Sequence, residues 1–486
     1  MSDVWTRNRA WIALLTAVFI SSACVPALQE HRDSEVEQVI PQGFADQGSD
    51  EPSTARTDWR AFFEDPNLQR LIEEALANNQ ELHILQQEIR IAASEVSARS
   101  GEVLPQAGVG VDAGAGKPGS YPLERHGPRA AFEGDGRVGT EYGIGVYATW
   151  EVDVWNKLRS ATKAAFFEYV ATFEGRNFAI TALVAEIANS YYELMALDQQ
   201  LQVIDSNLAI LKDALEVVRL QKQAARVTEL AVQRFEAEVF KNQSQRLDVL
   251  QQIVETENTI NVLVGRYPQP VTRNSADFLE ITAKPVQAGL PTQLLENRPD
   301  VRRAEFELKA AEMDVEVARA TFYPSLSIDA GVGLRSDRSL GLLATPESVF
   351  VGSVANLFVP LLNRRAIKAY YQSANAAQIR AVYEYERTVL TAYVECANQL
   401  SRIDKLSEAL ERRKEQVRVL NRSIEVSTIL FNSARADYLE VLTTRSEAQE
   451  SQLELVETKK NQLMAVVNMY RVLGGGWSEQ LVEATP

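Results

Sequence analysis

The sequence contains little cysteine, and after its first two dozen residues it has no hydrophobic run of membrane-helix length. Cys24 and Cys396 are the only cysteines among 486 residues. If Cys24 is modified, no disulfide can form within the chain, and the fold must depend on packing. We expect Cys396, which lies in a helical stretch, to be a small buried apolar residue.

Groups that would serve an active site are equally few. His31, His83 and His126 are the only histidines, and none belongs to a metal-ligand spacing. The run Gly474-Gly475-Gly476 is not followed by the Lys-Ser or Lys-Thr pair of a phosphate-binding loop. The formal net charge of −16 disfavours nucleic acid as a partner. We therefore expect no enzyme, no metal site and no nucleic-acid partner.

The N-terminus has the pattern of an export signal. Arg7 and Arg9 precede an apolar run at 10–20, and small residues then lead to Cys24. This pattern resembles a lipoprotein processing site. We expect a signal peptide at 1–23, a lipid on Cys24 and an extended lipidated tether at 24–57, with no cofactor beyond that lipid. Cleavage without lipid attachment is the alternative, because Ser21 stands where a large aliphatic residue is usual.

The rest of the chain is an internal duplication. The segment 225–230 (ARVTEL) returns as 434–439 (ARADYL), and Val264-Gly265 returns as Leu473-Gly474, both 209 residues later. Upstream, 92–105 is echoed by 311–324 at a spacing of 219. The two copies fill most of the chain and predict two similar structural units.

Each copy changes its hydrophobic period at a proline, Pro105 in the first and Pro324 in the second. Helical spacing precedes the proline, and apolar and polar residues alternate after it, as in a strand. A second strand follows a loop, and two helices follow that strand. We expect strands at about 104–116, 141–154, 324–336 and 348–360.

The helices after these strands are unusually long. The stretch 161–223 has no proline, so at 1.5 Å per residue it would extend about 90 Å. Leucine and other apolar residues recur there at steps of three and four, which predicts coiled-coil packing. The helices are expected to turn back at tips near 225 and 434.

Four strands in one chain cannot close into a barrel, which needs about eight or more. Lipid tolerates no open sheet edge. If the strands enter a membrane, several chains must contribute to one barrel, and three chains would supply twelve strands.

Several motifs then indicate a family. They are WRAFFEDPNL at 59–68, WEVDVW at 150–155, LLENRPDV at 294–301, FYPS at 322–325 and LGGGW at 473–477. In this order they resemble the TolC-like outer membrane efflux proteins, in the lipoprotein branch called NodT-type outer membrane factors. The resemblance covers about 58–477.

The resemblance implies a mainly α fold with membrane β structure. A duplicated, long α-helical coiled-coil barrel would carry four β-strands per chain, which complete a 12-stranded transmembrane β-barrel in a homotrimer. The first repeat would cover 58–268 and the second 292–477. An inter-repeat linker at 269–291 and a C-terminal tail at 478–486 complete the division.

The implied function is the exit duct of a tripartite efflux system, which passes small molecules out of the cell. The protein would be lipid-anchored in the outer membrane and extend into the periplasm. Its partners would be a periplasmic adaptor, or membrane fusion protein, and an inner-membrane transporter of the resistance-nodulation-division type. Two alternatives remain open: a non-conducting lipid-anchored coiled-coil envelope protein, and a protein-exporting type I secretion duct.

The resemblance also gives roles to the two tips. The adaptor would contact Ala225, Arg226, Val227, Thr228, Ala434, Arg435 and Ala436. Family members commonly carry Gly where Ala225 and Ala434 stand, so these turns either form tighter helical links or strain an alanine.

Arg435, Asp437 and Glu440 would line the periplasmic aperture. The hypothesis is that Arg435 pairs with Asp437, or with an acid of a neighbouring chain, and holds the resting tunnel shut. A ring of Glu440 would favour cations. The alternative is a solvated helix end, where exposed ion pairs contribute only about 0 to 1 kcal/mol.

Overall fold

A computed structural model describes residues 25–26, 41, 43, 54, 57–116, 139–283, 287–360, 364–433 and 435–477. The expected signal peptide, Cys24, most of the tether, Ala434 and the tail at 478–486 lie outside these residues. Among the described residues, no helix combines the length and the apolar character needed to cross a membrane.

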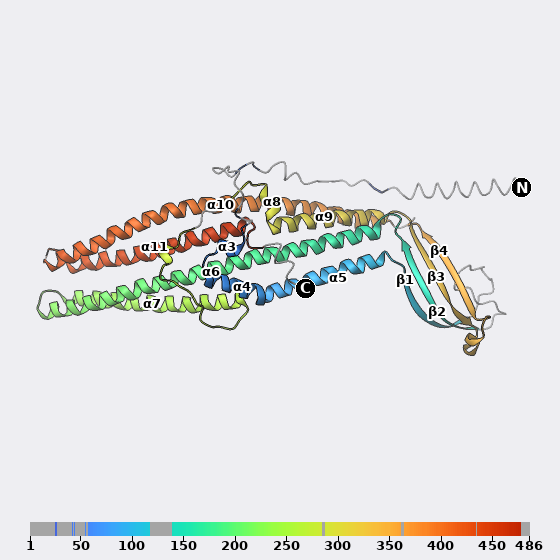
Figure 1. Ribbon diagram of the computed structural model, residues 1–486, viewed down its shortest axis with the longest axis horizontal. Coiled ribbons are helices and arrows are strands. Elements are labelled where there is room, and N and C mark those ends of the chain that lie inside the picture. The colour runs from blue at the N-terminus through green and yellow to red at the C-terminus, as the bar shows by residue number, and fades with distance from the viewer. Residues whose placement is uncertain are drawn as a thin grey trace. The chain divides into compact units, whose positions relative to one another are not determined.

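Long helices and four strands make up the described chain (Figure 1). The expectation of a mainly α fold with four strands per chain is confirmed. In chain order the elements are α3 (Trp59–Phe62), α4 (Pro66–Asn78), α5 (Gln80–Glu102), β1 (Gln106–Gly116), β2 (Gly139–Val152), α6 (Lys157–Gln223), α7 (Glu229–Val264), η2 (Phe278–Glu280), α8 (Gln293–Asn297), α9 (Pro299–Ala320), β3 (Ser325–Ser336), η3 (Ser339–Leu343), β4 (Val349–Phe358), α10 (Arg365–Asn432) and α11 (Tyr438–Val472).

The chain forms two compact units, and each unit takes segments from both repeats. The first combines Glu88–Thr172 with Ala304–Tyr385 and also holds Val25. The second combines Phe173–Arg303 and the chain after Tyr385 with the segment that ends at Gln87. The two repeats therefore contribute to both units, and neither repeat forms a unit by itself.

The first unit contains a single antiparallel sheet in the order β1-β2-β3-β4. Each strand begins and ends within two residues of its expected position. The register places Val109, Val146, Val332 and Val351 in one row across all four strands. The sheet joins the two repeats, because β2 belongs to the first and β3 to the second.

The second unit has a hydrophobic core where the short N-terminal helices meet the long ones. Trp59, Tyr191, Phe278 and Tyr470 are among its largest fully buried side chains. Phe62 stacks on Tyr470 with 4.1 Å between ring centroids. Both tyrosines also form hydrogen bonds with the segment that precedes α4. The Tyr191 hydroxyl donates to an Asp65 carboxylate oxygen at 2.6 Å, and the Tyr470 hydroxyl donates to the Thr57 carbonyl at 2.6 Å.

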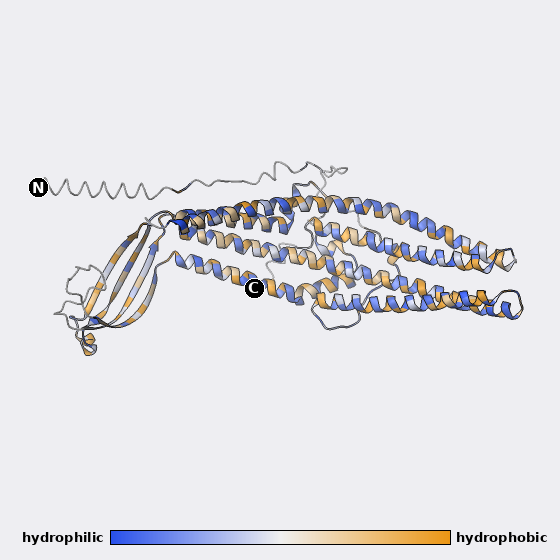
Figure 2. Cartoon of the chain, turned by 180° about the vertical axis from the view of Figure 1, so that it is seen from behind, coloured by the Kyte–Doolittle hydropathy of each residue, from blue (hydrophilic) through white to orange (hydrophobic). Residues whose placement is uncertain are grey.

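A second apolar cluster lies between α6 and α7, towards the first tip. It contains Leu211, Leu215, Phe235 and Val239, and Leu442 of α11 packs into it. Figure 2 shows hydrophobic and hydrophilic residues alternating along these helices, as amphipathic packing requires. The expectation for Cys396 is confirmed, because it is fully buried and burial raises the pKa of its thiol to about 12.

Candidate functional site

One face of the sheet is almost entirely apolar and open to the surroundings. No charged residue of the described strands lies on it. Val109 is 75% exposed and Val351 is 78% exposed, although both sit in the middle of strands. A monomeric soluble protein rarely exposes a contiguous apolar patch of this kind, so the face needs a covering. Ser353, in the row of Ala330, also lies on this face. Its apolar members are Ala107, Val109, Val111, Ala113, Tyr142, Ile144, Val146, Ala148, Trp150, Val152, Leu326, Ile328, Ala330, Val332, Leu334, Val349, Val351, Ala355 and Leu357.

The opposite face combines glycines with aromatic rings, among them Tyr147 and Phe350. The register places Gly108, Tyr147, Gly331 and Gly352 in one row. A Cβ atom at Gly110 would lie 2.9 Å from the Tyr147 ring, and one at Gly333 would lie 2.8 Å from the Phe350 ring. The glycines therefore provide the space in which Tyr147 and Phe350 lie flat against the sheet.

The same face carries every charged residue of the described strands. We call this surface the polar face; its charged members are Asp112, Glu141, Glu151, Asp329 and Arg335. Arg335 forms an ion pair with Glu141 at 3.0 Å, and its guanidinium lies 4.9 Å from the centre of the Phe350 ring. Glu151 pairs with Lys157 at the start of α6. The two faces thus differ sharply in chemistry, which suits a boundary between lipid and water.

Two sheet edges remain open in the part of the chain that the structure describes. β1 pairs only with β2, and β4 pairs only with β3. Each edge strand therefore presents a row of backbone N–H and C=O groups without a partner strand. Such edges accept another strand of matching direction.

The end of the sheet nearest the helices is fixed by hydrogen bonds from tryptophan. The Trp150 indole donates to the Val103 carbonyl at 3.0 Å, and the Trp155 indole donates to the Pro324 carbonyl at 2.8 Å. Trp155 also stacks on Tyr323 at 4.7 Å between centroids. The Asp153 carboxylate accepts from the Leu158 and Arg159 amides, which caps the start of α6.

Residues close to the N-terminus reach the same end of the first unit. Val25, the residue after Cys24, packs against a cluster that contains Phe322 and Tyr371. These two rings meet edge-on at 5.6 Å between centroids. Because Phe322 lies two residues before Pro324, Val25 is held close to the start of β3.

The first tip joins α6 to α7 through a left-handed alanine. Ala225 has φ of 54°, a conformation that normally favours glycine, so the strained alternative for this turn is the one observed. The Arg226 amide donates to the Gln221 carbonyl at 2.9 Å, as in a Schellman motif. Lys222 and Glu229 form an ion pair across the turn. Thr228 is the N-cap of α7 but makes no side-chain capping bond.

The second tip shares one backbone bond with the first, and its side chains differ. The Arg435 amide donates to the Leu430 carbonyl at 2.9 Å, the bond equivalent to that of Arg226. The Asp437 carboxylate accepts from the Tyr438 amide at 2.6 Å and caps α11. Ala434 lies outside the described residues, while Ala436 is half-buried.

The structure does not form the ion pair between Arg435 and Asp437 that the sequence suggested. Among the described residues Arg435 makes no ion pair, and its side chain is exposed. Asp437 caps α11 instead, because an aspartate immediately before a helix commonly accepts a hydrogen bond from the first backbone amides of that helix. Glu440 lies in the first turn of α11 and is also exposed. All three side chains therefore remain accessible to another molecule.

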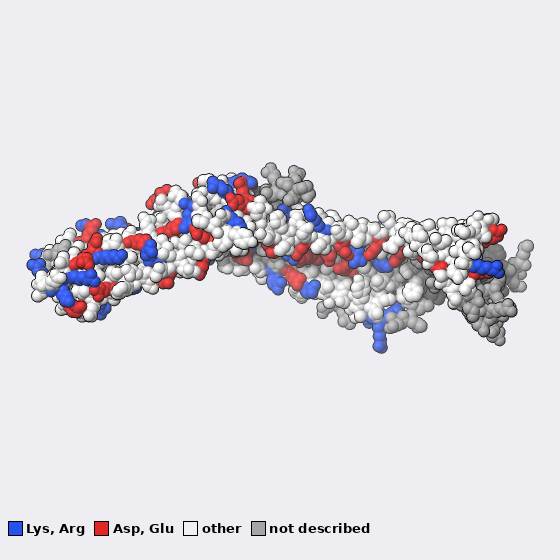
Figure 3. All heavy atoms as spheres, turned by 90° about the horizontal axis from the view of Figure 1, so that it is seen from below, with Lys and Arg blue, Asp and Glu red and all other residues white. Residues whose placement is uncertain are grey.

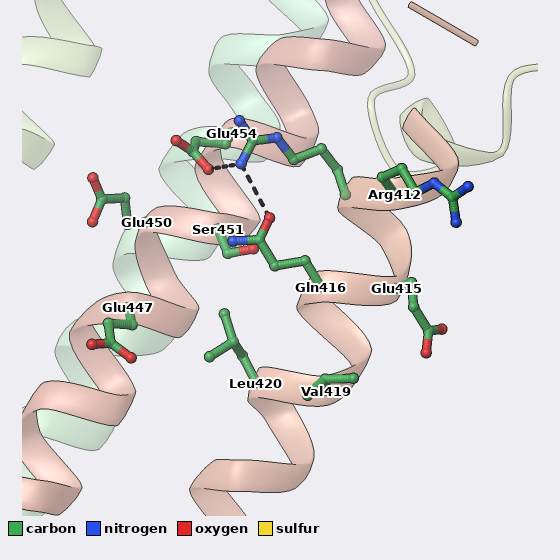
Figure 4. A pocket seen from close by; sticks show the side chains of 10 residues that line it. Arg412, Glu415, Gln416, Val419, Leu420, Glu447, Glu450, Ser451 and Glu454 are labelled. Carbon is green, nitrogen blue, oxygen red and sulfur yellow. Dashed lines mark hydrogen bonds and ion pairs between the residues drawn. The ribbon is translucent and has the colours of Figure 1, made fainter. Parts of the chain in front are cut away.

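Further along the second hairpin, α10 and α11 enclose a groove of about 670 Å³ (Figure 4). Arg413 donates to the Gln416 side chain at 3.1 Å and pairs with Glu454 of α11. Glu447 and Glu450 also line the groove from α11. Elsewhere on the helices, acidic and basic side chains are interspersed, as Figure 3 shows for one side of the molecule.

Comparisons with known proteins agree on one family. The family model described as outer membrane efflux protein matches residues 71–266 and 290–475. The chain is 25% identical over 471 residues to a protein of Salmonella typhimurium named as a probable outer membrane lipoprotein, SilC. That match covers 96% of this chain and 98% of SilC. It is 28% identical to the solvent efflux pump outer membrane protein SrpC of Pseudomonas putida, over 90% and 91% of the two chains.

A solved structure shares the fold. The open-state MtrE outer membrane channel of Neisseria gonorrhoeae superposes with a TM-score of 0.79 at 21% identity. The match covers 93% of this chain and 98% of that one. The likeness therefore extends over both the strands and the long helices.

Proposed function

Because the chain belongs to the outer membrane efflux protein family, we propose that it is the exit duct of a tripartite efflux system. The family consists of efflux ducts and not of enzymes, and this protein is an outer membrane component of an efflux system. In the proposed role it receives small molecules from an inner-membrane pump and passes them across the periplasm and the outer membrane.

The observation that carries this proposal is the contrast between the two faces of the sheet. An exposed apolar face suits lipid, and a polar face rich in glycine suits a water-filled interior. The open edges of β1 and β4 cannot remain unpaired in lipid. We propose that three chains join these edges and close a barrel of twelve strands.

Adjacent residues on β4 provide a matched test of this orientation. Val351 lies on the apolar face, and Gly352 lies on the polar face with no atom within 4 Å of an added Cβ. In outer membranes, Gly352→Cys should react with a water-soluble maleimide, whereas Val351→Cys should not. The unsubstituted protein gives the background from Cys24 and Cys396, and burial raises the pKa of the Cys396 thiol to about 12. Equal labelling of both variants would contradict a lipid-facing apolar face.

The lipid anchor is a further part of the proposal. The packing of Val25 on the Phe322 and Tyr371 cluster would hold a lipid on the preceding residue close to the start of β3. A diacylated Cys24 would then reach the membrane where the strands enter it. Mass spectrometry of the N-terminal peptide from outer membranes tests this assignment. A peptide with an unmodified N-terminus would support simple cleavage instead.

We propose that the two tips contact a periplasmic adaptor, and that the inner-membrane partner is a transporter of the resistance-nodulation-division type. Arg435 is exposed and without an ion pair among the described residues, so an acid of a neighbouring chain is the remaining partner for the latch hypothesis. Arg435→Glu should then raise resting conductance in bilayers, and Arg226→Glu at the first tip is the matched control. Equal conductance in both variants and the wild type would argue against the latch.

A further inference from the structure

We propose that Asp112 and Asp329 give the passage between the strands a preference for cations. They would act as specificity-determining residues within the sheet, separately from any charge at the helical tips. The inference rests on the proposed function, because it requires the polar face to line the water-filled interior.

Some charged side chains of the polar face form ion pairs with a side chain of opposite charge, and others do not. Its strands contribute the acids Asp112, Glu141, Glu151 and Asp329 but only one base, Arg335. Arg335 pairs with Glu141, and Lys157 of α6 pairs with Glu151. These two pairs are electrically neutral. Asp112 and Asp329 are the carboxylates that remain.

Neutral donors hold both remaining carboxylates. The Tyr147 hydroxyl donates to an Asp112 carboxylate oxygen at 3.0 Å. The Asn356 side-chain amide donates to an Asp329 carboxylate oxygen at 2.6 Å. A neutral donor fixes the position of a carboxylate without supplying a positive charge, whereas an arginine or lysine partner would offset the negative charge. Among the acids of the described strands, only Asp112 and Asp329 have a neutral donor and no ion pair.

The aromatic rings fix the surroundings of these carboxylates. The Tyr147 ring lies over Gly110 and Gly331, where an added Cβ would be 2.9 and 3.0 Å from it, so the two glycines make room for the ring to lie against the strands. A hollow of about 520 Å³ on the polar face is lined by Tyr147, Phe350 and Asp329, among others. Asp329 thus borders open space beside the rings. A passing cation would meet a fixed charge there in place of a mobile side chain.

The register separates the two charges along the passage. Asp112 is in the row of Gly143 and Arg335, and Asp329 is in the row of Thr149. The Tyr147 row lies between these two rows. Three copies around one axis would therefore place two successive rings of negative charge inside the barrel. Such rings favour cations over anions.

The test is the reversal potential of the full-length protein in planar bilayers across a gradient of potassium chloride. At low salt, where screening is weak, Asp112→Asn and Asp329→Asn should each lower the potassium-to-chloride permeability ratio by about threefold. Asp112→Glu and Asp329→Glu keep the charge and are the matched controls, with a ratio close to that of the wild type. Arg335→Gln should shift the ratio the opposite way, because it removes the positive charge of the polar face.

The outcomes separate this inference from the proposed function. The variant that combines Asp112→Asn with Asp329→Asn should have a lowered permeability ratio. A wild-type permeability ratio in this double variant would overturn the inference and place ion selection elsewhere, such as at Glu440. If the double variant fails to insert, Arg335→Gln tests the inference by itself. A lowered potassium-to-chloride permeability ratio in Arg335→Gln would also overturn the inference. A wild-type protein that inserts as stable oligomers but never conducts would overturn the proposed function itself.

Discussion

The two repeats contain the same helix junction, built once with a neutral side chain and once with a charged one. In the first, the Asn79 side-chain amide donates to the Leu263 carbonyl at the end of α7, at 2.8 Å. In the second, the Arg298 guanidinium donates to the Val472 carbonyl at the end of α11, at 2.9 Å. Leu263 and Val472 are 209 residues apart, as the duplication requires. One backbone position is therefore satisfied in two chemically different ways.

The backbone of the junction is more similar than its side chains. Gly265 and Gly474 follow the two helix ends with φ of 80° and 89°. An added Cβ would lie 2.3 Å from the Asn78 carbonyl oxygen in the first junction and 2.3 Å from the Asn297 carbonyl oxygen in the second. Both junctions therefore keep the close approach of two backbones, while the side chain that donates to the helix-end carbonyl differs.

Arg298 adds contacts that Asn79 lacks. It donates two bonds to Asp300, at 3.0 and 2.6 Å, and two to Glu395, each at 3.0 Å. Only 5% of the residue is exposed. The second junction thus joins α9, α10 and the end of α11 through one buried guanidinium. The largest difference between the repeats is expected when this group is removed.

Arg298→Ala should therefore be the most destabilising of the changes considered. It leaves Asp300 and Glu395 without their cation and the Val472 carbonyl without its donor, at a cost of about 3 kcal/mol in the free energy of unfolding. Guanidinium chloride unfolding in detergent, followed by circular dichroism at fixed protein concentration, measures the cost. A loss no larger than that of Asn79→Ala would contradict the distinction between the junctions.

The glycines should behave alike in both repeats. Gly265→Ala and Gly474→Ala each force an alanine into a left-handed conformation and against a carbonyl oxygen, which should cost about 2 kcal/mol. The same unfolding measurement applies to both variants. A cost at one position only would show that the two backbones are not equivalent.

Asn79→Ala should have a smaller effect than either glycine change. It removes the bond to the Leu263 carbonyl and a bond that the Asn79 side chain accepts from the Leu82 amide at 3.1 Å. The expected cost is about 1 kcal/mol. Asn79→Asp, which keeps the acceptor but not the donor, separates the two bonds. Full stability of Asn79→Ala would mean that water replaces both.

The smallest change is expected at the first tip, where alanine takes the conformation that glycine holds in the junctions. Ala225→Gly relieves the strain at φ of 54° but adds conformational freedom to the unfolded chain, so we expect a gain of about 0.5 kcal/mol. Ala224→Gly, one residue earlier, is the matched control and should destabilise. A loss of stability in Ala225→Gly would indicate that the left-handed conformation of Ala225 costs less free energy than the added freedom of glycine in the unfolded chain.

Much of the fold follows from local patterns in the sequence. The change of period at Pro105 and Pro324 predicts where strands begin, and the repeated Ala-Arg pairs predict the tips, because both signals lie within a few residues. The burial of Cys396 follows from its apolar helical surroundings. The left-handed Ala225 was one of two expected alternatives.

The rest depends on contacts between distant residues. Alternation assigns Arg335 and Glu141 to faces of their strands, but only the register of β2 on β3 brings them together. The partners of Arg298 include Glu395, 97 residues away. The described residues show no ion pair between Arg435 and Asp437, because Asp437 lies immediately before a helix and its carboxylate caps the backbone there. The pairing of Arg435 with an acid of a neighbouring chain stays a prediction.

The central claim is that the four strands of one chain complete a barrel with those of its copies. The most direct test is the native mass of the full-length protein extracted from outer membranes in detergent. A trimer is the predicted result, because three sheets then pair every open edge. A stable monomer would leave β1 and β4 unpaired and would contradict the channel, in favour of a tethered coiled-coil protein.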